Sequence, residues 1–306
     1  MAHAINVEAA AQSLANAGRS LADLEARFST ARSRAAARAI ERNADAMIWL
    51  ARLRSADQYS YDHAIDVSVH LMVFARFLGL PMKAIEQVGL AGMMMDIGKI
   101  DIPPEILSKA DNLTDEEYTL IQSHVASSLE MLLGRDGFST SVLEIVASHH
   151  ERVDGSGYPR RLKGERICFH GELAGLVDSY CAMTRNRAYG PAISSQKALE
   201  SLIRMRGGKF RDSVVDQFIQ CIGIYPIGSL VELNTGEVGV VIQQNQVRRL
   251  KPRLLMVLAA DKSIERFPVT LDLMMDPLTP DRREYRIVQA LPTNAYGIDP
   301  AEFYLA

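Results

Sequence analysis

The chain has 306 residues, of which 48% are apolar and 23% charged, and its formal net charge is −3. This is the composition of a soluble globular protein with room for two domains, and it offers no global attraction to nucleic acid or to an anionic membrane. The three cysteines form neither a zinc motif nor a disulfide framework, the opening residues lack a secretory signal, and no apolar run is long enough to span a bilayer. We therefore expect a cytoplasmic protein that binds no DNA and no membrane.

Residues 1–55 are rich in Ala, Arg, Glu and Leu, and apolar residues such as Leu14, Leu21 and Leu24 recur there at roughly helical spacing. We expect an N-terminal helical extension that packs on the next domain or joins two copies of the chain into a homodimer. The heptads are not sustained, which favours a plain extension over a coiled coil.

Residues 56–222 show helical periodicity throughout. Helices are predicted over 62–78, 81–95, 114–133, 140–150, 171–183 and 195–205. The third begins with a capping box from Thr114 to Glu117, and Gly98 is predicted to end the helix over 81–95. This part of the chain is expected to form one helical domain.

After Tyr225-Pro226 the pattern changes to short apolar runs separated by turn residues. Strands are predicted over 229–233, 238–242, 254–258 and 285–290, with a turn at 234–237 between the first two. The sequence thus predicts a mostly α protein in three parts: an extension over 1–55, a helical domain over 56–222 and a small C-terminal β module over 226–306.

Asp96 ends an apolar run that starts at Val88, and Lys99 follows three residues later. A carboxylate near the end of a buried helix is costly unless a cation compensates it. From this stretch alone, an ion pair between Asp96 and Lys99 is a better explanation than a bound metal, since structural ion pairs outnumber catalytic ones.

Histidines strengthen the case for a metal. His63 and His124 lie on predicted amphipathic helices, where a single histidine is usually structural. His149 and His150 are adjacent at the end of an apolar helix, just before the glycine-rich loop over 154–159, and are expensive to bury without a role. Asp178 adds a carboxylate to another apolar helix face, where it needs a partner.

Imidazoles and carboxylates on separate helices are the ingredients of a metal site in a bundle core. Mixed nitrogen and oxygen ligands suit iron, manganese or zinc, and we expect one or two divalent transition-metal ions, with iron or manganese favoured. Asp96 is the candidate bridge between two ions, which would clamp a phosphate and activate a water, and Lys99 would then steady the phosphate or the water.

Further residues extend these candidates into a longer pattern, which runs in chain order through His63, Asp96-Ile97-Gly98-Lys99, His124, His149-His150-Glu151, Gly157-Tyr158-Pro159, Asp178 and Arg187. The pattern resembles the HD-GYP domain, a branch of the HD metal-dependent phosphohydrolases that hydrolyses the bacterial second messenger cyclic di-GMP. The resemblance covers 56–222 and implies an HD-type helical bundle.

The resemblance also implies roles for these residues. Asp96 and Lys99 would be catalytic, Lys99 near the scissile phosphate. Loop residues Gly157, Tyr158 and Pro159 would lie beside the dinucleotide, and Arg187 would hold a phosphate. The implied metal ligands are His63, Asp96, His124, His149, His150 and Asp178.

Met95 departs from the pattern, because the family carries a histidine immediately before this aspartate. A thioether is a soft, neutral ligand and a poor substitute for imidazole on a hard divalent ion. One of two ions, the one that His63, Asp96 and Asp178 would hold, should therefore lose a ligand. Tyr59 stands where members with three ions carry a glutamate, and two acids, Asp66 and Glu172, replace arginines and could supply a compensating oxygen.

Two functional hypotheses follow. In the first, the chain is a metal-dependent phosphodiesterase that hydrolyses cyclic di-GMP, impaired by Met95. In the second, it is a degenerate, slow or inactive domain that binds cyclic di-GMP or a signalling protein. Met95 favours the second hypothesis, whereas the survival of the other ligands and of Lys99 favours the first.

Overall fold

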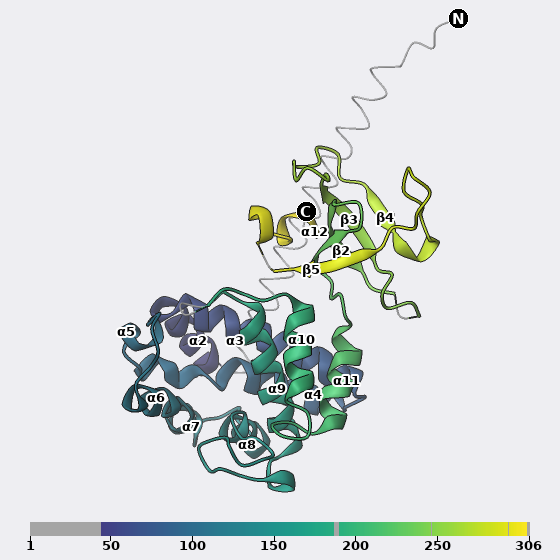
Figure 1. Cartoon of the computed structure of the whole chain (residues 1–306). Coiled ribbons are helices and arrows are strands. Elements are labelled where there is room, and N and C mark those ends of the chain that lie inside the picture. Colours follow the sequence, from purple (N-terminus) through teal and green to yellow (C-terminus); the bar gives the residue numbers. More distant parts are fainter. Residues whose placement is uncertain (1–43, 187–189, 246, 293, 305–306) are drawn as a thin grey trace, which may run out of the picture. The chain divides into compact units, whose positions relative to one another are not determined.

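In the computed structural model of the chain (Figure 1), the described residues are 44–186, 190–245, 247–292 and 294–304. By its internal contacts the chain divides into two units, Met1–Ala51 and Arg52–Ala306. Helix α2, Ala44–Ala56, is the part of the predicted N-terminal extension that is described. The rest of that extension, and the homodimer contact predicted for it, lie outside the described residues.

A set of helices follows α2 and confirms the mostly α prediction. α3 packs against α4, α9 and α11, and α8 against α4, α7 and α9. α9 is buried along most of its length, from Gly171 to Ala182, because it is apolar on nearly every face. The helices are α3 (Gln58–Phe77), α4 (Met82–Met94), α5 (Pro104–Leu107), α6 (Asp115–Gln122), α7 (His124–Leu132), α8 (Thr140–Ser148), α9 (Phe169–Thr184), α10 (Ser195–Arg204) and α11 (Asp212–Ile222).

The predicted helix over 114–133 is wrong in one respect, since it breaks at Ser123 into α6 and α7. The capping box at Thr114 and Glu117 is present. At the break, the His124 ring nitrogen Nδ1 lies 2.6 Å from the Ile121 carbonyl oxygen, an oxygen that the next turn of an unbroken helix would use. His124 is buried as a result.

α11 was not among the predicted helices, although its sequence carries the signal. Val214, Val215, Phe218 and Ile222 are buried and recur at helical spacing. Phe218 packs edge-on against Phe74 of α3, with 5.1 Å between ring centroids.

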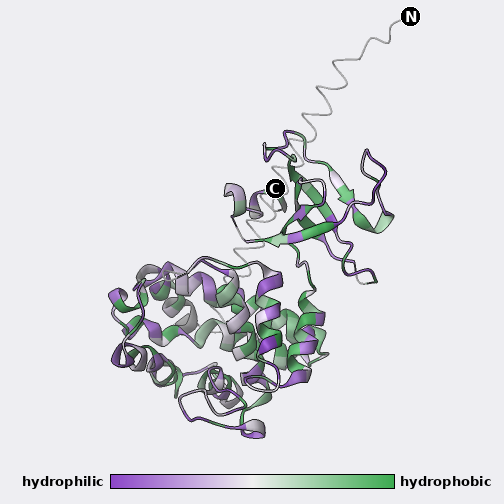
Figure 2. Cartoon of the chain, viewed as in Figure 1, coloured by the Kyte–Doolittle hydropathy of each residue, from purple (hydrophilic) through white to green (hydrophobic). Residues whose placement is uncertain are grey.

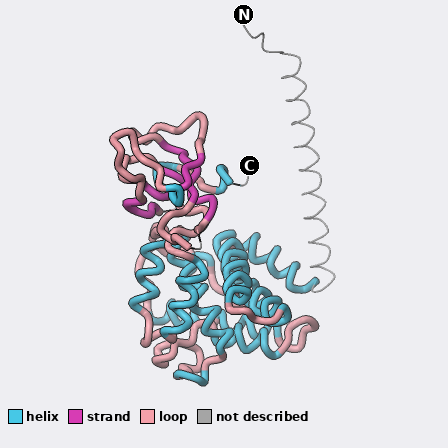
Figure 3. The backbone as a smooth tube through the Cα atoms, turned by 90° about the vertical axis from the view of Figure 1, so that its right-hand side faces the viewer, coloured by secondary structure: helices cyan, strands magenta, loops and turns pink. Residues whose placement is uncertain are grey.

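The C-terminal residues form one antiparallel sheet in the order β4-β3-β2-β1-β5, whose strands gather together in Figure 3 and are mostly hydrophobic in Figure 2. One apolar cluster includes Leu230 and Val240, and the other includes Val231 and Val241, as alternation along each strand requires. This sheet confirms the small β module; the domain boundaries remain predictions. The strands are β1 (Leu230–Leu233), β2 (Val238–Gln243), β3 (Arg253–Leu258), β4 (Thr270–Asp272) and β5 (Ile287–Leu291), of which β4 was not predicted.

The prediction that Gly98 ends the helix over 81–95 is wrong. α4 ends at Met94, and Gly98 lies inside the 3-10 helix η1, Ile97–Asp101. A Cβ on Gly98 would lie 2.3 Å from the His124 carbonyl oxygen and 2.6 Å from the Ser128 amide nitrogen. Glycine is therefore needed because η1 crosses the backbone of α7 at close range.

Replacing Gly98 with alanine should lower the free energy of unfolding by about 1–3 kcal/mol, because the added methyl group meets backbone atoms that have no room to move. Urea denaturation measures this change. Gly190→Ala is the matched control, since a Cβ there meets nothing within 4 Å. Equal stability of the two variants would contradict the close crossing of η1 and α7.

None of the described helices has both the length and the hydrophobicity needed to cross a membrane.

Candidate metal centre

The six predicted metal ligands converge from separate elements into two adjoining groups. Asp96, in the turn between α4 and η1, belongs to both groups. Each group offers donor atoms that all lie within 4.8 Å of one another. One group is Asp96, His124, His149 and His150, and the other is His63, Asp96 and Asp178.

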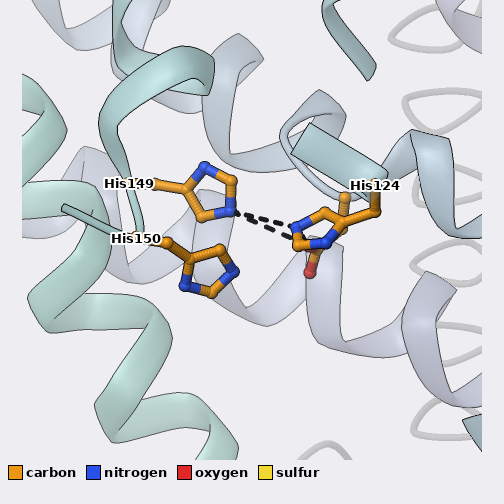
Figure 4. A group of neighbouring side chains, drawn as sticks. His124, His149 and His150 are labelled. Carbon is orange, nitrogen blue, oxygen red and sulfur yellow. Dashed lines mark hydrogen bonds and ion pairs between the residues drawn. The ribbon is translucent and has the colours of Figure 1, made fainter. Parts of the chain in front are cut away.

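The first group is centred on one oxygen of Asp96. Its Oδ1 atom lies 3.2 Å from His124 Nε2 and 3.9 Å from His149 Nε2, and these two nitrogens are 3.5 Å apart. Figure 4 shows the rings of His149 and His150 side by side, with His124 facing them from another helix. Asp96, His124 and His149 are each at most 2% exposed.

The outer nitrogens of two of these rings determine what the inner nitrogens can do. Nδ1 of His124 lies 2.6 Å from the Ile121 carbonyl oxygen, and Nδ1 of His149 lies 2.7 Å from that of Val146. A carbonyl only accepts, so the proton of each neutral ring sits on Nδ1 and the lone pair on Nε2. Both lone pairs face the Asp96 side chain.

Asp96 Oδ1 is buried and has no hydrogen-bond donor. Three electron pairs then face one another, an arrangement that repels unless a cation lies between them. A divalent ion would supply that cation, since neutral imidazoles and an ionised carboxylate are the forms that bind metal. The donor set of this group therefore fits a divalent metal ion.

Burial favours the neutral form of His149 and His150 in this group. It lowers the pKa of His149 from 6.5 to about 4, although the charge of Asp96 acts in the opposite direction. The pKa of His150 is also lowered well below its usual value, by burial and by the neighbouring His149. Neutral rings are the form that binds metal.

These shifts predict that the metal-free protein loses stability in mild acid. Below about pH 6.5 the unfolded chain protonates His149, whereas the folded chain does not until about pH 4, so the stability present above pH 6.5 falls through this window. The loss for one such group is on the order of 3 kcal/mol. Urea denaturation of metal-free protein at pH 7.5 and pH 4.5 measures it, and His149→Asn should show a shallower decline. The same slope in both proteins would contradict the buried, neutral ring.

The three residues of the second group take part in two close pairs, one of which includes Lys99. His63 Nε2 lies 2.8 Å from Asp178 Oδ1, and Lys99 Nζ donates to Asp96 Oδ2 at 2.9 Å. Burial alone would raise the pKa of both carboxyls, but the hydrogen bond from His63 lowers that of Asp178, and the charge of Lys99 lowers that of Asp96. Both carboxylates therefore stay ionised, and the Asp96–Lys99 ion pair exists beside the imidazole cluster.

The glycine-rich loop reaches the first group through Tyr158. Its ring stacks on His150, with centroids 4.5 Å apart and an angle of 26° between the rings. Gly157 permits this approach, because a Cβ there would lie 2.3 Å from the His150 carbonyl oxygen. Pro159 follows Tyr158 in the same loop. The remaining predicted substrate contact, Arg187, lies outside the described residues.

Two residues next to the histidines have structural roles that the sequence analysis did not assign. Glu151 is buried and accepts hydrogen bonds from the backbone nitrogens of Arg160 at 2.7 Å and Leu162 at 2.8 Å. Arg152 Nη1 donates to the carbonyl oxygens of His149 at 2.9 Å and Glu151 at 2.8 Å. Arg152 thus holds the backbone on the C-terminal side of His149.

The two acids considered as compensating ligands are engaged elsewhere. Asp66 accepts from Arg185, whose Nε lies 3.1 Å from Asp66 Oδ2. Glu172 accepts from the backbone nitrogen of Arg211 at 2.6 Å and pairs with its side chain at 3.3 Å. Neither acid belongs to the two donor groups found among the described residues.

Comparisons with known proteins agree with this geometry. The chain is 35% identical over 223 residues to a cyclic di-GMP phosphodiesterase of Pseudomonas aeruginosa, an alignment that covers 73% of this chain and 54% of that protein. The chain therefore spans about half the length of this relative. A cyclic di-GMP phosphodiesterase of Vibrio cholerae is 37% identical over 141 residues, 44% of this chain and 29% of that protein. A 3'3'-cGAMP-specific phosphodiesterase of Vibrio cholerae is 33% identical over 157 residues, 50% of this chain and 36% of that protein.

A family model described as an HD domain matches residues 25–214, which is more than half of the chain and includes all six converging residues. The chain belongs to the HD domain family.

Proposed function

We propose that this chain is an HD-GYP-type phosphodiesterase that hydrolyses cyclic di-GMP with the help of a divalent metal ion, iron or manganese. The observation that carries the proposal is the buried Asp96 Oδ1, which lacks a donor and faces the lone pairs of two imidazoles. Relatives named as phosphodiesterases of cyclic dinucleotides support the substrate class.

Asp96, His124, His149 and His150 would hold the ion. When bound, a divalent ion polarises a phosphoryl oxygen and makes a nearby water acidic enough to attack at neutral pH. His124 and His149 are oriented for this task by their hydrogen bonds to backbone carbonyls, and Arg152 holds the backbone of His149 in turn. Outer contacts of this kind usually matter for metal affinity.

Lys99 would supply positive charge to the phosphate. Burial alone would lower its pKa, but Asp96 and Asp178 raise it, so the ammonium group stays charged. Its side chain is 19% exposed, so it reaches from the buried carboxylate toward solvent. A fixed ammonium placed where charge develops stabilises the transition state of phosphoryl transfer.

The loop of Gly157, Tyr158 and Pro159 would line the dinucleotide side of the centre, since Tyr158 stacks on His150. Tyr118 of α6 meets the Tyr158 ring edge-on, with centroids 6.5 Å apart, and is half exposed. Exposed aromatic rings suit the flat faces of nucleobases. The resemblance adds Arg187 as a phosphate contact.

Met95 favours a second candidate function. If the missing imidazole abolishes turnover, the same site would act as a cyclic di-GMP receptor that signals to a protein partner or to a second copy of the chain. The two functions share this site and differ only in the fate of the ligand.

Incubating the purified, manganese-loaded chain with cyclic di-GMP separates these functions. The phosphodiesterase predicts linear dinucleotide or GMP on chromatography, and no product after the metal is removed with a chelator. Binding in equilibrium dialysis without product would support the receptor. A parallel incubation with 3'3'-cGAMP tests the substrate, and neither binding nor hydrolysis of either dinucleotide would overturn both functions.

A further inference from the structure

We propose that the Lys99 ammonium group occupies the place of a second metal ion, so that this chain binds one divalent ion. The inference deepens the proposed function, because it concerns the same site and states how many ions that site holds. It starts from the two oxygens of Asp96, which face different partners. Oδ1 faces the imidazoles of His124 and His149, whereas Oδ2 accepts from Lys99 at 2.9 Å.

A carboxylate that bridges two ions gives one oxygen to each. Here, the oxygen that would serve the second ion is already paired with an ammonium group. Asp96 is 2% exposed, so this pair is shielded from water and is stronger than a surface ion pair. A second ion would have to break the pair before it could bind.

The other donors of the second group are also engaged. His63 Nε2 and Asp178 Oδ1 pair at 2.8 Å, and both residues are buried. The residue before Asp96 is Met95, which is fully buried and offers only a neutral thioether. Asp66 and Glu172 are held by arginines. The second group thus has three hard ligands, each with a partner already.

Lys99 already pairs with one carboxylate of the second group, because its Nζ donates to Asp96 Oδ2 at 2.9 Å. One ammonium group therefore neutralises part of the negative charge that a second ion would otherwise compensate. The first group contains no lysine or arginine: its three other members are histidines, and Asp96 Oδ1 has no hydrogen-bond partner. The asymmetry between the groups points to one ion, held by the first.

Metal counting tests this inference without reference to catalysis. The full chain is dialysed against excess Mn²⁺, and the bound metal is measured by mass spectrometry. We expect one ion per chain. Isothermal titration should give a second binding event about tenfold tighter or more in Lys99→Gln than in the parent chain, because Asp96 Oδ2 loses its competing cation. Lys99→Arg keeps the charge and should still bind one ion.

Lys109→Gln is the matched control. Lys109 also pairs with a carboxylate, Glu117 at 2.6 Å, but on the partly exposed surface of α6. This variant should bind metal like the parent chain. Two ions of similar affinity in the parent chain would overturn the inference, and that result needs no variant to fold. An unchanged second event in Lys99→Gln would overturn it as well. One ion per chain without any hydrolysis of cyclic di-GMP would instead overturn the proposed phosphodiesterase and leave this inference standing.

Discussion

Asp96→Asn is expected to abolish both metal binding and hydrolysis. The amide matches the carboxylate in size but has no negative charge, and its oxygen is a weak ligand for a hard divalent ion. Because Asp96 belongs to both donor groups, no other described residue replaces it. The loss of metal affinity should exceed the 10- to 100-fold that is typical of outer contacts, so roughly 100-fold is a lower bound.

Bound metal per chain and product formation from cyclic di-GMP measure the two effects of Asp96→Asn. Asp101→Asn is the control. It makes the same chemical change at an exposed position, at the end of the short helix η1 that follows Asp96. That variant should retain metal and activity. Full metal content in Asp96→Asn would show that the ion binds elsewhere.

Met95→His is expected to act in the opposite direction. It places an imidazole next to Asp96, so the second group gains a fourth hard ligand and can compete with Lys99, whose partly exposed side chain can move toward solvent. We expect the metal content to rise from one ion per chain to two, and turnover of cyclic di-GMP to rise by about 10- to 100-fold or more.

Metal analysis and steady-state kinetics of Met95→His provide the measurements. Met94→His is the control, since it places the same side chain one position earlier, on another face of the buried helix end. It should lower stability without adding an ion. If Met95→His gains neither metal nor turnover, Met95 is not the reason for the incomplete second group.

Much of the centre is predictable from the sequence because its residues are costly to bury without partners. Asp96 follows an apolar run, Asp178 stands in an apolar helix, and the adjacent His149 and His150 precede a glycine-rich loop. Each pattern alone has a bland explanation. Their order along the chain matches the pattern of one family, which predicts a single site. In the structure, all six metal-ligand candidates lie in two adjoining groups.

Other features depend on contacts between elements that lie far apart in the chain. Gly98 has the local signature of a helix end, yet its role is to let α7 cross at close range. Arg152 follows Glu151 with no sequence signal for its role, yet its guanidinium donates a hydrogen bond to the carbonyl oxygen of His149. Asp66 and Glu172 are candidate ligands by sequence, but in the structure they pair with Arg185 and Arg211. Periodicity and composition do not encode such partners.

Anomalous diffraction from crystals of the manganese-loaded protein tests the central claim most directly. We expect one strong peak per chain, bound by Asp96, His124, His149 and His150, with Lys99 still paired to Asp96 Oδ2. A peak at any other place, or none in protein saturated with metal, would contradict the claim that these side chains form a metal centre.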